Sequence, residues 1–216
     1  MIKLEHTEVS GWEAAIRGMR NPMNSWDKSD TKIWNIIDPE TDDCVGFDYR
    51  IGENDHNLMM NLAKAGRSHS KYRRMIIVSC DITAPLYWWK EFDTYKVGTV
   101  ANSCSTMHKI HAKQFTMDDF SHEHLSEVAE ETLEFVITML NEGRKWFLTN
   151  GDKKHWWQMI QLLPTSYNQK RTVQLNYEVL ANMYRDRKNH KLDEWREFCK
   201  WVEALPYSEI IVRGNE

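Results

Sequence analysis

Residues 98–107 combine the side chains that are best suited to holding a polar ligand. They read GTVANSCSTM, a run of small and hydroxyl-bearing residues that packs poorly as core. The run permits close approach to the backbone and offers many hydrogen-bonding groups. Just before it, LYWWKEF follows Pro85 and mixes aromatic with charged residues, as a half-buried helix does. Pro85 suits the first position of that helix, because the N–H it lacks would be unpaired there. We expect this helix to support the polar segment and a ligand bound to it.

Other reactive residue types form no convincing constellation. The pairs His108/His111 and His122/His124 invite a metal interpretation, but no third ligand stands at a persuasive spacing, so we predict no metal site. No CxxC pair and no nucleophile pattern is present, and we expect reduced thiols that fill the interior. The four cysteines are Cys44, Cys80, Cys104 and Cys199.

Composition narrows the class of protein. The chain has 216 residues, of which 41% are hydrophobic, enough for one domain spanning residues 1–216. A net charge of −4 makes no strong case for nucleic acid. The first residues, MIKLEHTEVSGW, lack the apolar centre of a signal peptide, and no apolar run approaches the length of a membrane span. We therefore expect a soluble, cytoplasmic protein.

Alternation and helical spacing of apolar residues predict an α+β fold. Strands are expected at 2–9 and 75–83, with an extended segment at 165–175. The polar stretch 21–54 is expected to be irregular except around 32–37 and 44–51, where short strands or a functional loop are expected. Helices are expected at 12–19, 54–65, 85–92, 122–142, 153–163, 177–188 and 192–205, and the tail from 208 is a loose strand or an ordered end. Ser10 is expected to cap the first helix, and Gly143 to end the helix that begins at residue 122.

Two spaced sets of residues resemble the flavin-dependent thymidylate synthase family. That family has a strand leading into an Ala-Pro helix, then Arg-His-Arg, then Asn-Glu-x-Ser-x-Arg-Tyr. Here MIIVSCDIT leads into Ala84-Pro85, and NSCSTMH at 102–108 matches the second half of the signature. Leu163-Pro164 is followed by Asn176, Asn182 and Arg187 at the family's intervals of twelve, six and five residues. The resemblance covers about residues 55–200. It implies a thymidylate synthase-complementing-protein-like fold, with a mixed or antiparallel sheet packed against several helices.

The departures from the family pattern remove charge. Thr94-Tyr95-Lys96 stands where the family has Arg-His-Arg, Ser103 replaces the signature's Glu, and Met107 replaces its final Arg. These changes remove bidentate donors of the kind that bind phosphate. A family histidine near the flavin falls close to Met75, beside Arg73 and Arg74.

The resemblance implies a role for each matching residue. The expected cofactor-binding residues are Asn102, Asn176 and Asn182, which match the family, together with Lys96 and Arg74, which we expect to replace part of the missing phosphate charge. The expected substrate-binding residues are Ser103, Ser105, Arg187 and His108. Ser105 would bond phosphate or polarise the pyrimidine, and Arg187 would stabilise negative charge that develops on the base, so these two are the expected catalytic residues. FAD is the implied cofactor, methylenetetrahydrofolate and NADPH are the co-substrates if the chemistry is retained, and the assembly would be a homotetramer.

The same residues have plainer roles, which leave three functions open. Asn176 is a good helix cap, Arg187 suits a helix C-terminus, and Ser105 suits a turn. The first expected function is that of a divergent FAD-dependent methyltransferase acting on dUMP or a related pyrimidine nucleotide. The alternative is a non-catalytic relative that binds a nucleotide or a partner. The third is an oligomeric structural protein with neither ligand.

Overall fold

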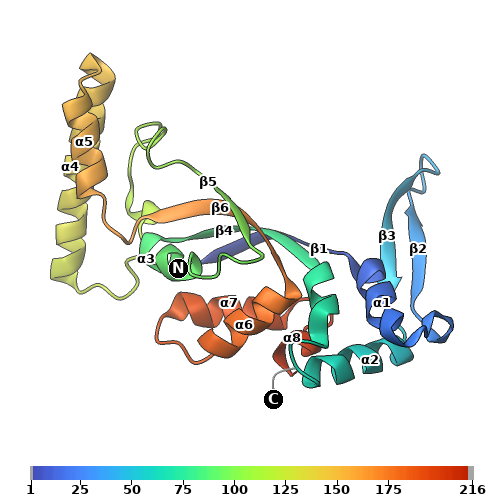
Figure 1. The fold of residues 1–216 in the computed structure, drawn as a ribbon. Coiled ribbons are helices and arrows are strands. Elements are labelled where there is room, and N and C mark those ends of the chain that lie inside the picture. Colours follow the sequence, from blue (N-terminus) through green and yellow to red (C-terminus); the bar gives the residue numbers. More distant parts are fainter. Residues whose placement is uncertain (1, 214–216) are drawn as a thin grey trace.

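A four-stranded antiparallel sheet runs through the middle of the molecule (Figure 1). The computed structural model describes residues 2–213. The strand order is β1 (Lys3–Ser10), β4 (Ile77–Pro85), β6 (Asn168–Asn176) and β5 (Val100–Ser103). Buried and half-exposed residues alternate along β4, so the sheet has one apolar and one polar face. On the polar face, Thr172 and Lys170 contact the Asp81 carboxylate at 2.6 and 2.9 Å.

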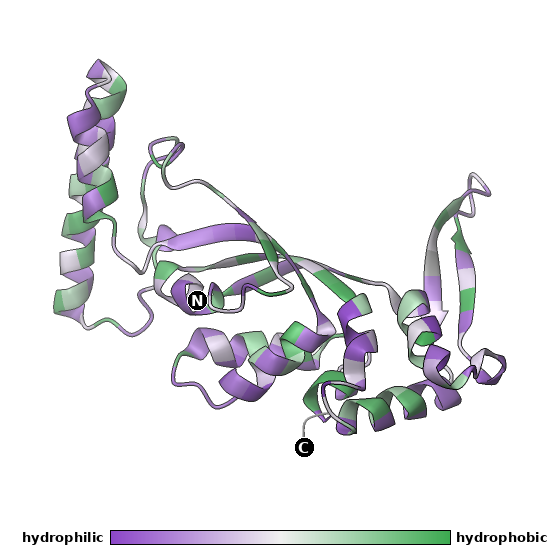
Figure 2. Ribbon diagram, in the orientation of Figure 1, coloured by the Kyte–Doolittle hydropathy of each residue, from purple (hydrophilic) through white to green (hydrophobic). Residues whose placement is uncertain are grey.

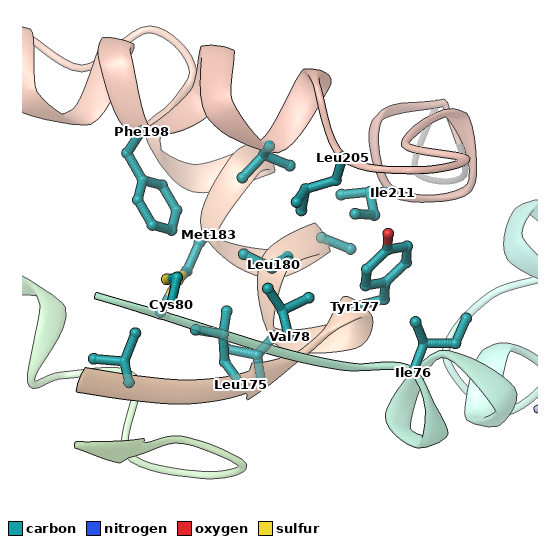
Figure 3. Close-up of a cluster of buried hydrophobic side chains, with 14 of the residues drawn as sticks. Ile76, Val78, Cys80, Leu175, Tyr177, Leu180, Met183, Phe198, Leu205 and Ile211 are labelled. Carbon is teal, nitrogen blue, oxygen red and sulfur yellow. The ribbon is translucent and has the colours of Figure 1, made fainter. Parts of the chain in front are cut away.

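Helices cover the apolar face of the sheet. Figure 3 shows Val78, Cys80 and Leu175 of the sheet facing Leu180 and other side chains of the C-terminal helices. These helices are α6 (Tyr177–Arg187), α7 (Asp193–Glu203) and α8 (Glu209–Val212), and α3 (Leu86–Phe92) follows β4. The strands at 2–9 and 75–83 and the helices at 85–92, 177–188 and 192–205 are thus confirmed to within a few residues. The tail forms the short helix α8 rather than a strand.

The first helix begins differently from the prediction. Ser10 ends β1, and Gly11 caps α1 (Trp12–Arg20) in the left-handed region at φ 88°. A Cβ at Gly11 would lie 2.0 Å from the Met75 carbonyl oxygen. The tight crossing of the chain over Met75 therefore sets this boundary, and the prediction that Ser10 caps the first helix is wrong.

A two-stranded hairpin and a helix follow α1. The elements are η1 (Asn21–Met23), η2 (Trp26–Lys28), β2 (Lys32–Ile37), β3 (Cys44–Arg50), α2 (Glu53–Lys64) and η3 (Ser70–Met75). Buried Asp55 holds the base of the hairpin: it accepts hydrogen bonds from Arg20 Nε at 2.6 Å, Thr31 Oγ1 at 2.6 Å and Ser29 Oγ at 2.7 Å. The predicted strands and the helix at 54–65 are confirmed.

A pair of antiparallel helices projects from the other end of the sheet (Figure 1). It consists of α4 (Glu127–Asn150) and α5 (Lys153–Leu162), preceded by η4 (Met117–Asp119). The helix predicted from residue 122 begins only at Glu127, because the preceding residues form a turn in which the Leu125 N–H donates to the His122 carbonyl oxygen at 3.0 Å. Gly143 does not end α4; it lies in the buried seam with α5, where a Cβ would stand 3.3 Å from Met159 Cγ. The helix ends instead at Gly151, at φ 68°.

All four cysteines are free thiols. Cys80 and Cys199 are buried as predicted, but Cys44 and Cys104 are exposed, so the prediction that they fill the interior is wrong. Burial raises the pKa of both buried thiols to about 12.

Within residues 2–213, every helix is too short or too polar to cross a membrane.

Candidate functional site

Helix α6 begins at a residue that both caps it and faces a hollow. Asn176 Oδ1 accepts a hydrogen bond from the Val179 N–H at 3.1 Å, the N-cap interaction that satisfies an otherwise unpaired donor. The amide nitrogen Nδ2 of Asn176 points toward Gly98, because a Cβ at Gly98 would meet it at 3.1 Å. Capping therefore uses the oxygen of Asn176 and leaves the nitrogen as a donor.

Two adjoining hollows, of about 280 and 270 Å³, lie along this flank of α6. They share Arg67, Val97, Val179 and Asn182, and we call them together the α6 groove. The first is completed by Arg74, Gly98, Asn176 and Glu178. The second is completed by Thr94, Tyr95, Lys96, Arg185 and Asp186. Four of the five residues predicted to bind a cofactor, Asn176, Asn182, Lys96 and Arg74, are thus brought together from three separate parts of the chain.

The loop opposite α6 needs a glycine. Gly98 has φ 81°, in the left-handed region, and a Cβ there would meet Val179 Cγ2 as well as Asn176 Nδ2 at 3.1 Å. Thr99 Oγ1 donates to the Tyr95 carbonyl oxygen at 2.7 Å and closes the loop on itself. The backbone therefore forms one wall of the groove.

The carboxylate of Glu178, which lines the α6 groove, is paired with the buried guanidinium of Arg73. Arg73 is only 1% exposed, and its Nη1 lies 3.5 Å from Glu178 Oε2, to which Ser70 Oγ also donates at 3.3 Å. Arg73 Nε and Nη2 are buried without a hydrogen-bond partner among the described residues. The carboxylate of Glu178 is thereby compensated from below, and Arg67 and Arg74 remain as the cations of the first hollow.

Arg187 lies behind Tyr95 rather than in the groove. Its Nη1 donates to Glu91 Oε2 at 2.7 Å, its Nε donates to the Tyr95 hydroxyl at 3.0 Å, and its guanidinium carbon lies 4.9 Å from the centre of the Trp195 ring. Burial raises the pKa of the Tyr95 hydroxyl, an effect that hydrogen bonding to Arg187 opposes. Because Tyr95 lines the groove, Arg187 is one side chain removed from it.

The remaining predicted residues form a third group. Asn102 and Ser103 are exposed on β5, in register with Thr172 and Arg171 of β6. Ser105 Oγ accepts from the N–H groups of Met107 at 3.2 Å and His108 at 3.0 Å, so it caps a turn. None of these residues lines either hollow.

The turn that Ser105 caps docks on the α4–α5 pair. Trp156 Nε1 donates to the Met107 carbonyl oxygen at 3.1 Å. Segment 102–108 therefore leads away from the α6 groove along β6 (Figure 1). Among the described residues, the predicted site residues therefore lie in three separate places: the α6 groove, Arg187 behind Tyr95, and segment 102–108.

Sequence reasoning missed Arg67 and Glu178. Arg67 Nη2 donates to Asn182 Oδ1 at 2.7 Å, across 115 positions of sequence. The only local signal was that Arg67 closely follows the helix predicted at 54–65, and no spacing rule links it to α6. Glu178 lies two residues after Asn176, and its first-turn position suggested only a favourable helix dipole.

The groove residues fit a flavin. Amide groups suit the ring edges of an isoalloxazine, and arginine and lysine suit phosphate. Because Gly98 has no side chain, the backbone at this wall of the groove can lie close to a flat ring. At about 270 and 280 Å³, each hollow lies just below the usual range of ligand-pocket volumes, so each suits a ring system rather than a whole dinucleotide.

Comparison with known proteins gives a match in structure alone. No family model matches the sequence, and no curated protein matches it. Among solved structures, thymidylate synthase X (ThyX) from Helicobacter pylori, with FAD and dUMP, has a TM-score of 0.69 at 15% identity, covering 99% of each chain. The UMP/dUMP methylase PolB from Streptomyces cacaoi, bound with 5-Br UMP, has a TM-score of 0.63 at 12% identity, covering 100% of this chain and 95% of that one.

These matches run over the whole described chain, including the helical pair and the hairpin. They confirm the α+β assignment and, at the level of fold, the resemblance drawn from the two spaced sets of residues. The chain therefore has the fold of the flavin-dependent thymidylate synthases.

Proposed function

We propose that this protein is a divergent FAD-dependent methyltransferase acting on dUMP or a related pyrimidine nucleotide. The observation that carries the proposal is the α6 groove, where Asn176, Asn182, Lys96 and Arg74 come together. The shared fold supports it, because the Helicobacter protein holds FAD and dUMP and the Streptomyces protein is a UMP/dUMP methylase. We further propose methylenetetrahydrofolate as carbon donor, NADPH as reductant, a homotetrameric assembly and a cytoplasmic location.

The groove residues would hold the cofactor. Asn176 Nδ2 and the amide of Asn182 would bond the ring edges, and Lys96 and Arg74 would neutralise phosphate. When bound and reduced by NADPH, the flavin would supply the two electrons that take the transferred carbon to a methyl group. The wall at Gly98 would exclude water from one side of the ring.

Arg187 would act on the base. A guanidinium aimed at a pyrimidine carbonyl stabilises the negative charge that develops there. In the present arrangement Glu91 holds Arg187 at 2.7 Å, so base binding requires this pair to open or to share its donors. Ser105 already accepts two backbone N–H groups, and its own O–H is left to donate to a nucleotide phosphate. Asn102, Ser103 and His108, exposed on the same segment, would contact the flavin or the nucleotide with it.

A visible absorption spectrum tests the proposal directly. Purified protein is scanned before and after incubation with FAD and desalting, and dUMP is then added to the flavin-loaded protein. We expect retained flavin and a spectral change on adding dUMP. The Arg187→Ala variant should keep its flavin and lose nucleotide-dependent flavin oxidation. An Asn189→Ala variant, altered at an exposed position beyond α6, should behave as the unmodified protein does. A protein that cannot hold FAD would exclude the flavoenzyme and leave nucleotide or partner binding without flavin.

A further inference from the structure

We propose that Arg67, which lies outside every motif position, binds a phosphate of the ligand and supplies charge lost where Thr94 replaces an arginine. The proposal rests on the proposed function, since it concerns the same groove. Arg67 follows α2, after a turn at Gly66 with φ 98°. It lines both hollows, as do only three other residues of the described chain.

The position of the Arg67 guanidinium is fixed from one side. Its Nη2 donates to Asn182 Oδ1 at 2.7 Å, which ties the side chain across the middle of the α6 groove. A guanidinium carries five N–H donors in a planar fork, so one bond to an amide leaves donors for a bidentate contact with phosphate. Asn182 therefore acts as a positioning residue for Arg67.

Ion pairing separates Arg67 and Arg74 from the other arginines nearby. Arg73 is paired with Glu178, Arg185 with Asp186 at 3.1 Å, and Arg187 with Glu91. Between residues 2 and 213, the structure shows no carboxylate partner within 4.0 Å of the side-chain nitrogens of Arg67, Arg74 or Lys96.

The carboxylates do not cancel this charge. Glu178 and Asp186 are the acidic residues that line the groove, and each is already paired with a different arginine. A hollow lined by unpaired cations attracts anions and raises their local concentration. Arg67 is the cation common to both hollows, so a phosphate in either one is within the region that it lines.

A phosphate in this groove has two sources: the diphosphate of the flavin dinucleotide or the monophosphate of the pyrimidine nucleotide. Paired ligands separate them, because riboflavin lacks the phosphates of FAD and deoxyuridine lacks the phosphate of dUMP. All four ligands are titrated by calorimetry, the nucleotide pair into flavin-loaded protein. The variants are Arg67→Ala, Arg67→Lys and, as a matched loss of one positive charge, Arg17→Ala on the exposed face of α1.

For Arg67→Ala, we expect the affinity for FAD, dUMP or both to fall roughly ten- to a hundredfold, the range for a hydrogen bond to a charged group. Riboflavin and deoxyuridine should bind as before. Arg67→Lys should recover part of the loss, since it keeps the charge but not the fork, and it tests the charge even if the alanine variant fails to fold. Arg17→Ala should change no affinity by more than about twofold.

Three results would overturn the inference. If FAD and dUMP bind Arg67→Ala as tightly as they bind the unmodified protein, Arg67 contacts no phosphate, and the proposed function stands without it. If riboflavin or deoxyuridine weakens as much as its phosphorylated partner, Arg67 contacts the ring or the sugar instead. If the unmodified protein binds none of the four ligands, the proposed function itself fails and this inference fails with it.

Discussion

At the scale of single residues, Glu91 controls whether Arg187 is available to a ligand. Its Oε2 accepts from Arg187 Nη1 at 2.7 Å and from Trp195 Nε1 at 2.9 Å, and it lies 3.4 Å from His190 Nε2. Glu91→Gln keeps an oxygen to accept these bonds and removes the charge that holds Arg187. Because a partly exposed ion pair contributes little, we predict that dUMP binds the flavin-loaded variant roughly two- to fivefold more tightly. Titration followed by the flavin spectrum measures this change.

The matched control for Glu91→Gln is Glu13→Gln, which breaks an exposed pair with Arg17 on α1 and should leave dUMP affinity unchanged. Weaker dUMP binding by Glu91→Gln would mean that the pair orients Arg187 for the base rather than withholding it.

Residue roles were predictable where the partner is local. Asn176 caps α6 through the Val179 N–H three residues away, and a capping preference foretells such a bond. Arg67 meets Asn182 across 115 positions, and Arg187 meets Glu91 across 96. Only the tertiary packing of the helices brings these pairs together, so no pattern in the sequence could indicate that one arginine is bound by an amide and the other by a carboxylate.

At the scale of elements, the loop that carries Gly98 shapes the wall of the groove. Gly98→Ala imposes a left-handed backbone on alanine and drives its Cβ to 3.1 Å from Asn176 Nδ2 and Val179 Cγ2. We predict a loss of about 1–3 kcal/mol in the free energy of unfolding, together with weaker FAD binding. Urea unfolding and flavin titration measure the two effects.

Gly151→Ala is the control for backbone strain alone. Gly151 has φ 68°, and a Cβ there meets nothing within 4 Å, at the far end of the α4–α5 pair. It should lose stability but keep its affinity for FAD. Equal weakening of FAD binding in the two variants would show that Gly98 acts through stability rather than through the shape of the wall.

The buried carboxylate under the hairpin makes that element sensitive to acid. Burial alone would raise the pKa of Asp55, but hydrogen bonds from Thr31, Ser29 and Arg20 outweigh it and lower the pKa below its ordinary value of 3.8. A lowered folded pKa adds stability above the ordinary value, and this stability is lost as the pH falls from 3.8 through the folded pKa. Asp55→Asn should therefore lower the free energy of unfolding by about 3–5 kcal/mol at pH 7, because Arg20 is left uncompensated. On acidification, the variant should lose less stability than the unmodified protein does.

Unfolding by urea at pH 7 and at pH 3 measures this difference. Asp43→Asn, at an exposed position near the hairpin turn, should follow the unmodified protein at both values. If Asp55→Asn loses as much stability between pH 7 and pH 3 as the unmodified protein does, the acid sensitivity comes from other carboxylates.

Element types were predictable, but the start of α1 and both ends of α4 were not. The alternation along β4 and the apolar spacing of α6 are local patterns, and both elements formed as expected. Gly143 looks like a helix stop, yet it lies in the seam where α4 and α5 approach closely, so packing against Met159 replaces termination. Ser10 looks like a cap, yet the crossing of Gly11 over the Met75 carbonyl sets the turn. In both places a contact between residues distant in sequence determined whether the small residue ends or caps a helix.

At the scale of the whole molecule, two arms extend from opposite ends of the sheet (Figure 1), and Figure 2 shows hydrophobic residues along both. Several of these residues have exposed side chains. On the hairpin these are Ile33, Trp34, Ile36, Ile37 and Val45. On the helical pair they are Val128, Phe135, Met139, Trp146, Leu148, Trp157 and Leu162. A two-stranded hairpin alone in water is marginally stable, and grouped apolar residues on a surface mark an interface. The proposed homotetramer would cover them with other copies of the chain.

The assembly is tested by placing one charge in each arm. Ile36→Lys and Phe135→Lys would each bury an unpaired ammonium in an interface between copies, which costs far more than the lost apolar contact. We predict that light scattering finds a tetramer for the unmodified protein and a smaller species for each variant, with helix content kept. Met23→Lys, at an exposed methionine outside both arms, should remain tetrameric. If the unmodified protein is a monomer, the arms are not covered by further copies. If only one variant dissociates, that arm alone forms the interface, and the other exposed surface needs a different partner.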